Sequence, residues 1–169
     1  KKNENIFVTA LLQDIGILIM YLSKGSEYTA TLEQCLVNGG ADLISLERKM
    51  YQFDHQQLGH TLLQDWGIPK SIITPIRYHH EPSLAPEEHK RTCSVLNMAN
   101  LLGIIYNGTE TVQTVQELHT KMAALFDITE DQTRSLIDDV AEKSVDILKI
   151  FDIDPGQMKP YSQMLQEAN

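Results

Sequence analysis

The chain has little cysteine, and this excludes several kinds of site. Its 169 residues include two cysteines, Cys35 and Cys93, which lie far apart and form no CxxC pair. A zinc site built on either cysteine would need partners at ligand spacing, and there are none. Both cysteines have apolar neighbours, so we expect two small buried side chains in a reducing, cytoplasmic compartment.

Basic residues are also scarce. The chain has 14 lysines and arginines against 23 aspartates and glutamates, a formal net charge of −9. The densest basic pair, Lys90-Arg91, closely follows Glu87 and Glu88. A nucleic-acid-binding surface needs a basic stripe, so we expect no nucleic-acid partner.

No uninterrupted apolar run is long enough to span a bilayer. Gln13 and Asp14 interrupt the most apolar stretch, in which Phe7 and Leu11 repeat at helical spacing. We therefore predict one buried helix over about residues 5–22 and no membrane insertion.

Because the first residue is Lys1 rather than methionine, we also expect an N-terminally truncated piece of a longer protein.

Alternating β-branched segments are absent, whereas helical periodicity recurs along the chain. We predict an all-α protein, a single-core bundle of about eight helices. After the first helix, the pattern predicts helices over about 29–37, 41–51, 55–66, 69–80, 88–106, 112–126 and 130–151, with a last one beginning after Gly156.

The predicted helix at 55–66 has the clearest start signal. Asp54 is a typical N-cap residue, and Gln57 completes a capping-box pattern. Leu58, Leu62 and Trp66 would then form its buried stripe.

Sequence signatures of common catalytic sites are missing. Gly39-Gly40 lacks the strand and lysine of a phosphate-binding loop, and no serine or cysteine nucleophile motif occurs. Polar residues do fall on or beside apolar helix faces, from four predicted helices: Asp14, His55, His79, His80 and Asn100. A buried polar atom without a partner costs about 1–3 kcal/mol, so we expect these side chains to converge.

Several motifs carry a family resemblance. The segment ALLQDIG at 10–16 resembles the ALLHDIG segment of HD-superfamily metal-dependent phosphohydrolases, with glutamine in place of histidine. DHxxxGxxLLxxWGxP at 54–69, IxYHHEP at 76–82 and LNMANLL at 96–102 resemble the HDOD domain. That family is a non-catalytic relative of HD enzymes found in bacterial signalling proteins.

The resemblance implies where a metal site once stood. Active HD enzymes hold metal with a His-Asp pair matching 13–14 and with histidines matching His55, His79 and His80. They also use an aspartate where Asn100 stands in this sequence. Gln13 and Asn100 offer only weak neutral amides in place of imidazole and carboxylate ligands.

Two interpretations of these residues follow. The favoured one is a vestigial metal pocket or ligand pocket with no catalytic residue, no metal and no cofactor, made of Gln13, Asp14, His55, His79, His80 and Asn100. In the other, one ion is held by Asp14, His55, His79 and His80. One histidine of the adjacent pair is also expected to face solvent.

The resemblance also implies a domain organisation for this chain. Residues 1–154 would form the HDOD-type domain, and 155–169 would begin a connecting helix toward an output domain such as a GGDEF diguanylate cyclase. We therefore expect a regulatory module of cyclic di-GMP signalling that senses a small molecule or a protein partner, with a homodimer left open. The alternatives are a metal-dependent phosphohydrolase acting on a nucleotide or cyclic dinucleotide, and a scaffold that recruits another protein.

Overall fold

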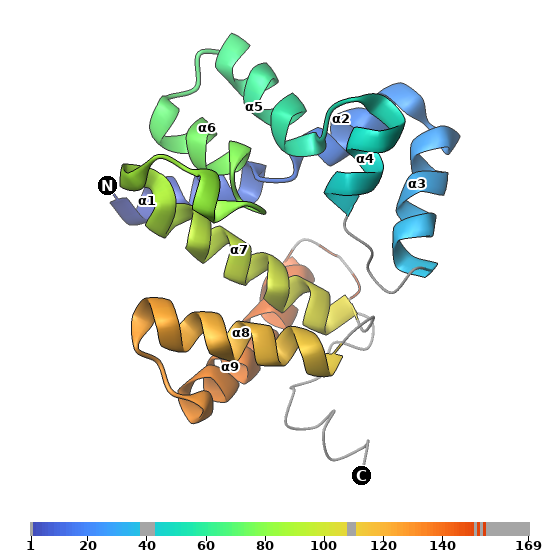
Figure 1. Ribbon diagram of the computed structural model, residues 1–169. Helices are drawn as coiled ribbons and strands as arrows, with labels where there is room; N and C mark the ends of the chain where they lie inside the picture. The colour runs from blue at the N-terminus through green and yellow to red at the C-terminus, as the bar shows by residue number, and fades with distance from the viewer. Residues whose placement is uncertain (1, 38–42, 108–110, 151, 153, 155–169) are drawn as a thin grey trace. The chain divides into compact units, whose positions relative to one another are not determined.

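All regular secondary structure is helical in the residues described by the computed structural model, which are 2–37, 43–107, 111–150, 152 and 154. The all-α prediction is confirmed (Figure 1). The helices are α1 (Lys2–Leu12), α2 (Ile15–Lys24), α3 (Ser26–Val37), α4 (Leu43–Tyr51), α5 (His55–Asp65), α6 (Lys70–Arg77), the 3-10 helix η1 (Pro82–Leu84), α7 (Glu87–Asn107), α8 (Thr111–Phe126) and α9 (Glu130–Ile150).

The chain divides into two compact units, Lys1–Ala99 and Asn100–Asn169, and each is described by itself. That residues 1–154 share one core and form one domain stays a prediction. The predicted connecting helix at 155–169 lies outside the described residues.

The N-terminal apolar stretch forms two helices, so the prediction of one continuous helix over residues 5–22 is wrong. The chain turns at Gln13-Asp14, and the Asp14 carbonyl accepts a 2.9 Å hydrogen bond from the Ile17 N–H. Asp14 has non-helical backbone angles, and its side chain makes no cap hydrogen bond to α2. Its carboxylate lies near histidines of other segments instead.

The prediction that this stretch is buried is also wrong. Four large apolar side chains, which we call the apolar stripe, are between 51% and 74% exposed: Phe7, Leu11, Leu18 and Leu22. The residues of this stretch that are buried include Thr9, Gly16 and Met20. By length and composition alone, the stretch Asn5–Lys24 could cross a membrane, with a mean hydropathy of 1.9.

Helices α5 and α6 lie at the centre of the first unit. They pack against each other, α2 packs on α5, and α1 packs on α6 (Figure 1). Their contact buries Leu63, Ile73 and Ile76, and the partly buried residues around these are Leu12, Ile15, Ile68 and Ile72. Trp66, predicted to be buried, is 64% exposed because α5 ends at Asp65 and Gly67, with φ of 74°, turns the chain.

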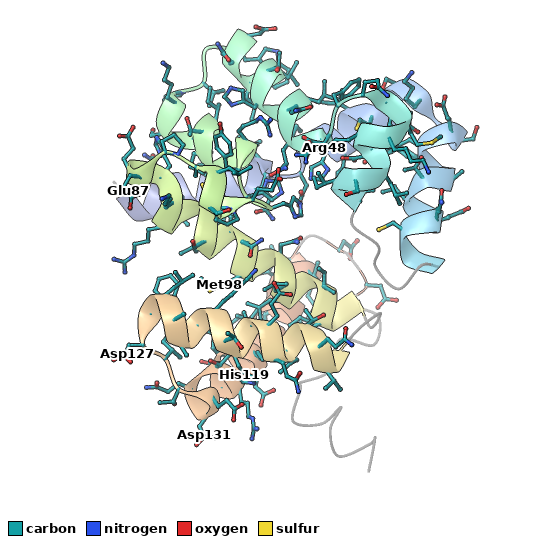
Figure 2. All side chains as sticks on the ribbon, in the orientation of Figure 1. Arg48, Glu87, Met98, His119, Asp127 and Asp131 are labelled. Atoms are coloured by element: carbon teal, nitrogen blue, oxygen red, sulfur yellow. The ribbon has the colours of Figure 1, made fainter. Side chains whose placement is uncertain are left out.

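The second unit is built on α8 packed against α9. Leu118 and Ile137 are fully buried, and the Tyr106 hydroxyl donates a hydrogen bond to the Ile137 carbonyl. Thr129 and Gln132 form reciprocal hydrogen bonds at the start of α9, as in a capping box. Acidic residues in its first turn, such as Asp131, complement the helix dipole (Figure 2).

Candidate ligand and metal site

The N-terminus of α5 fixes the backbone of His55. The Asp54 carboxylate accepts a 2.8 Å hydrogen bond from the Gln57 N–H, and the Gln57 side chain accepts a 3.2 Å bond from the Asp54 N–H. This capping box was predicted from the sequence and is confirmed. It makes His55 the first helical residue, where its side chain is completely buried.

The adjacent histidines lie in a bend after α6, not in the helix as predicted. Helix α6 ends at Arg77, and the Nδ1 atom of His79 lies 2.8 Å from the Ile76 carbonyl oxygen. This contact satisfies one of the carbonyls that a helix end leaves without a partner. The His80 N–H donates a 3.0 Å hydrogen bond to the Gln56 side chain. Leaving the helix allows neighbouring imidazoles to turn toward the same point.

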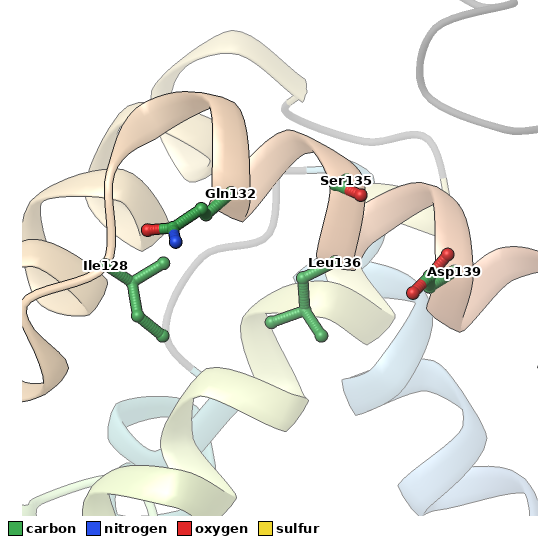
Figure 3. A pocket seen from close by; sticks show the side chains of 5 residues that line it. All are labelled: Ile128, Gln132, Ser135, Leu136 and Asp139. Carbon is green, nitrogen blue, oxygen red and sulfur yellow. The ribbon is translucent and has the colours of Figure 1, made fainter.

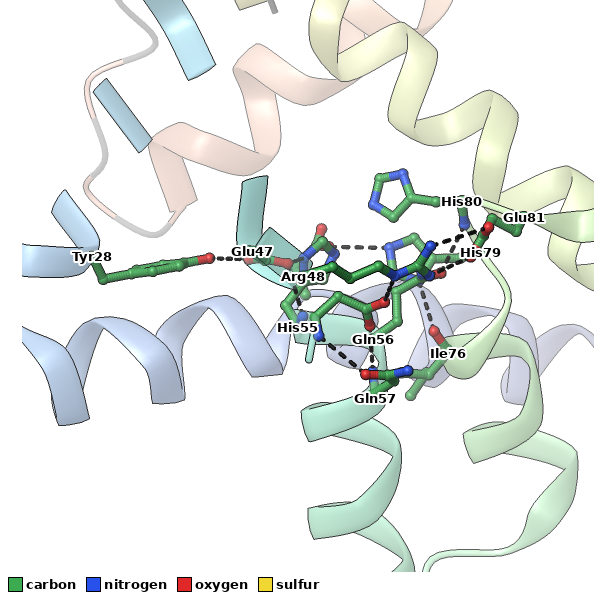
Figure 4. Close-up of polar contacts among 12 residues, drawn as sticks. Tyr28, Glu47, Arg48, His55, Gln56, Gln57, Ile76, His79, His80 and Glu81 are labelled. Atoms are coloured by element: carbon green, nitrogen blue, oxygen red, sulfur yellow. Dashed lines mark hydrogen bonds and ion pairs between the residues drawn. The ribbon is translucent and has the colours of Figure 1, made fainter. Parts of the chain in front are cut away.

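Asp14, His55, His79 and His80, which we call the histidine cluster, come together in the first unit. Each offers one ligand atom, and these four atoms all lie within 4.8 Å of one another. The His79 and His80 ring centres are 4.1 Å apart, and His55 lies 5.6 and 5.1 Å from them (Figure 4). His79 is completely buried and His80 is half-buried. The cluster thus joins the α1–α2 turn, the start of α5 and the bend after α6.

Hydrogen bonds define which nitrogen of two imidazoles carries the proton. His55 Nδ1 lies 2.8 Å from Glu47 Oε2, and His79 Nδ1 faces the Ile76 carbonyl. Carboxylate and carbonyl oxygens only accept, so both Nδ1 atoms donate. Each Nε2 lone pair of the neutral ring therefore faces the cluster. Within the described residues, both Nε2 atoms are buried without a hydrogen-bond partner.

Asp14 supplies the carboxylate of the cluster. Its Oδ1 atom lies 3.3 Å from His79 Nε2 and 3.7 Å from His55 Nε2. Burial raises the pKa of Asp14, but when the imidazoles are protonated, a hydrogen bond from His79 and the positive charges of His79, His55 and His80 outweigh this effect and lower the pKa. The net effect is a pKa below the ordinary value, so the group is ionised at neutral pH.

Glu47 and Tyr28 belong to the site and were missed by the sequence prediction. Glu47 is completely buried and accepts hydrogen bonds from the Tyr28 hydroxyl at 2.5 Å and from the His55 N–H at 2.9 Å, besides its contact with His55 Nδ1 (Figure 4). One signal existed: Glu47 lies three residues after Ile44, which is buried on the same face of α4.

Arg48 ties together the two segments that carry the histidines. Its guanidinium lies 2.7 Å from Asp54 at the start of α5 and 2.6 Å from Glu81 directly after His80 (Figure 4). The hydrogen bond to Glu81 is the main reason why the pKa of Arg48 is raised above its ordinary value. Paired with two carboxylates from different segments, it holds His55 and His80 at a set separation.

The two amide positions of the predicted pocket are placed differently. Gln13 adjoins Asp14 and is half-buried; its Oε1 atom is buried and has no hydrogen-bond partner among the described residues. Asn100 is a half-buried residue at the start of the second unit. That Asn100 shares a pocket with the cluster stays a prediction.

The donor set of the cluster fits one divalent transition-metal ion. Imidazole nitrogens and a carboxylate suit zinc, iron or manganese. Ligands about 2.0–2.2 Å from a tetrahedral ion lie about 3.4 Å from one another. The 3.3 and 3.7 Å separations between Asp14 and the two imidazoles match that spacing. The observation that favours this fit is that the Nε2 atoms of His55 and His79 are buried and find no hydrogen-bond partner in the part of the chain that the structure describes.

A separate hollow of about 310 Å³ lies in the second unit (Figure 3). Its lining residues are Ile128, Gln132, Ser135, Leu136 and Asp139. With one carboxylate and no imidazole or thiol in this lining, it offers no paired acid and base. The histidine cluster is therefore the stronger candidate site.

Comparisons with known proteins agree with the resemblance seen in the motifs. Residues 1–82 match the family model of the HDOD domain, and this segment contains the whole histidine cluster. An uncharacterized protein of Treponema pallidum (strain Nichols) is 28% identical over 95 residues, which are 56% of this chain. The match spans 18% of that protein's length. No solved structure matches the chain significantly.

Proposed function

Residues 1–82 belong to the HDOD family, an HD-related domain of signalling proteins, and on that premise we propose that this chain is a non-catalytic regulatory module. It would couple binding of a ligand or partner to an output domain that follows it, with a diguanylate cyclase as the expected output. The observation that carries the proposal is the histidine cluster, where buried imidazole nitrogens that have no hydrogen-bond partner among the described residues face a carboxylate.

The position of the cluster supports a sensing role. Its ligand atoms come from three segments: the α1–α2 turn, the α5 N-terminus and the bend after α6. A ligand that bridges them stabilises one arrangement of these helices over others. The mechanism is a shift of population between arrangements, and its size equals the difference in affinity for them.

The donor set also supports a non-catalytic role. Catalytic zinc sites usually have three protein ligands and keep one position open for water or substrate. Four protein ligands, Asp14 and the three histidines, would fill a tetrahedral site and leave no open position. Gln13 adds only a neutral amide beside them.

The test uses a longer protein that contains this chain and its cyclase, with cyclic di-GMP synthesis as the readout. We expect His79→Gln to change the rate, because it removes a buried group that faces the cluster. His60→Gln is the matched control: the His60 imidazole is half-buried and contacts the Ile73 carbonyl at 3.1 Å, outside the cluster. Equal rates for wild type and His79→Gln would overturn the proposal.

A metal-dependent phosphohydrolase is the second candidate, because the same cluster could hold a catalytic ion. Purified protein loaded with manganese, iron or zinc should not hydrolyse cyclic di-GMP or nucleotides. Turnover that disappears in Asp14→Asn would replace the regulatory proposal with this one.

A recruiting scaffold is the third candidate, and the exposed apolar stripe on α1 and α2 favours it. Exposed contiguous apolar side chains commonly mark interaction sites. Capture of a partner by the wild type, but not by a Phe7→Ser/Leu11→Ser variant, would support a scaffold.

We propose a cytoplasmic protein without membrane insertion, since the turn at Gln13-Asp14 divides the apolar stretch.

A further inference from the structure

We propose that Glu47, supported by Tyr28, is a positioning residue for a divalent metal ion bound by the histidine cluster. This inference rests on the proposal that the cluster is where the module receives its ligand. Neither residue belongs to the motifs that carry the family resemblance. Both are assigned here from their contacts alone.

Glu47 controls the chemical state of His55. Its Oε2 atom contacts both the backbone N–H of His55, at 2.9 Å, and Nδ1 of the ring, at 2.8 Å. The two contacts fix the ring orientation and keep the proton on Nδ1. Nε2 is then a free lone pair aimed into the cluster, as metal binding requires.

The Nδ1–H groups of His55 and His79 donate hydrogen bonds to different kinds of acceptor. The Nδ1–H of His79 donates to the neutral Ile76 carbonyl, whereas that of His55 donates to a carboxylate. A carboxylate acceptor draws the proton more strongly and makes the opposite nitrogen a better donor to a metal. His55 is therefore expected to be the strongest imidazole ligand of the set.

The charge of the site favours a cation. Glu47 is completely buried, and the donors that contact it, the Tyr28 hydroxyl and the two N–H groups of His55, carry no fixed positive charge. Asp14 adds a second carboxylate on the other side of the imidazoles. Burying the Glu47 carboxylate without a cation is costly, whereas the Asp14 side chain is 42% exposed. A divalent ion on the Nε2 side of His55 would offset both charges.

Tyr28 contributes by holding the second oxygen of Glu47. Its ring is completely buried, and its hydroxyl donates to Oε1. Oε2 is thereby left for His55. Without this hydroxyl the Glu47 carboxylate has fewer hydrogen-bond donors, so it accepts more strongly from the Nδ1–H group of His55. The affinity of the cluster for a metal ion should therefore not fall.

The experiment titrates the metal-free chain with Co²⁺ and Zn²⁺ and follows the visible absorption of bound Co²⁺. We expect the wild type to bind one ion and Glu47→Gln, which keeps the size but loses the charge, to bind about 10–100-fold more weakly. The Co²⁺ absorption bands should also shift, because the donor strength of His55 has changed. A role in folding alone would not move these bands.

Tyr28→Phe and Tyr51→Phe complete the design. Tyr51 lies beside Tyr28 and bonds to Thr31 at 3.0 Å, so Tyr51→Phe removes a nearby hydroxyl without touching Glu47. We expect Tyr51→Phe to bind Co²⁺ like the wild type, and Tyr28→Phe to bind at least as tightly with shifted bands. If Glu47→Gln does not fold, Tyr28→Phe carries the test; unshifted bands or weaker binding would overturn the role of Glu47.

Two further outcomes separate this inference from the proposed function. A wild type that saturates with neither Co²⁺ nor Zn²⁺ overturns the inference, while regulation by another ligand would still be measurable through cyclase output. Tight Co²⁺ binding that depends on Glu47, without any effect of His79→Gln on cyclase output, supports the inference and overturns the proposed function.

Discussion

The backbones of Gly16 and His55 touch. A Cβ atom added to Gly16 would lie 2.0 Å from the carbonyl oxygen of His55 and 2.9 Å from its Cα. Helix α2 therefore meets the start of α5 at a separation that only glycine permits. This contact places the α1–α2 turn, with Asp14, against the first residue of α5.

Gly16→Ala should be strongly destabilising. The obstacle is backbone, which cannot rotate away, so the cost should reach or exceed the upper end of the range of about 1–3 kcal/mol typical of overpacking. Gly103→Ala is the control: nothing lies within 4 Å of a Cβ at this exposed position in α7, where alanine should stabilise by about 0.5–1 kcal/mol. Urea unfolding of both variants checks this, and equal stabilities would contradict the contact.

His55→Ala should reduce stability even without metal. The change removes one of three hydrogen-bond donors to the buried Glu47 carboxylate, so that Oε2 keeps only the backbone N–H of residue 55, which costs about 1–3 kcal/mol. Far-ultraviolet circular dichroism during denaturation measures the loss. A variant as stable as the wild type would show that the buried network contributes nothing to folding.

Leu63→Ala should unfold the first unit more easily than any surface change. Leu63 is 1% exposed in the core between α5 and α6, and such truncations cost about 2–5 kcal/mol. Leu84 is 63% exposed, so Leu84→Ala should change stability by less than about 0.5 kcal/mol. A similar midpoint of chemical denaturation for the two variants would refute this assignment of the core.

Cys93 should make stability fall at alkaline pH. Burial raises the pKa of its thiol to about 11 from an ordinary value of 9.0. The unfolded chain loses this proton first, so the contribution is complete below pH 9 and is lost as pH rises toward 11. Comparing the thermal midpoints of the wild type and Cys93→Ala from pH 8 to 11 measures it. A constant difference between them would contradict the effect.

The sequence predicted correctly a feature that depends only on residues close together in the chain. The capping box at Asp54 and Gln57 depends on residues three apart, and its hydrogen bonds form as predicted. Convergence was expected of Asp14, His55, His79, His80 and Asn100, because unpaired polar groups on apolar faces need one another; the first four converge, and the place of Asn100 in this pocket stays a prediction. Their role in binding stays a proposal.

The failed predictions of burial share one cause. Periodicity tells which residues share a helix face but not whether another element covers that face, so Phe7 and Trp66 were expected inside and are exposed. The extension of α6 through His79 and His80 failed because the His79 side chain bonds back to the last turn of the helix. Such a contact leaves no mark in hydrophobic spacing.

By itself, the sequence determined the helical class, the start of α5 and the types of ligand atom available, since each follows from local propensity and periodicity. The tertiary structure decided which nitrogens face the cluster. That choice depends on the buried Glu47 carboxylate and the Ile76 carbonyl. A tautomer is selected by the acceptor that meets the ring, and Glu47 reaches His55 only because folding brings α4 against the start of α5.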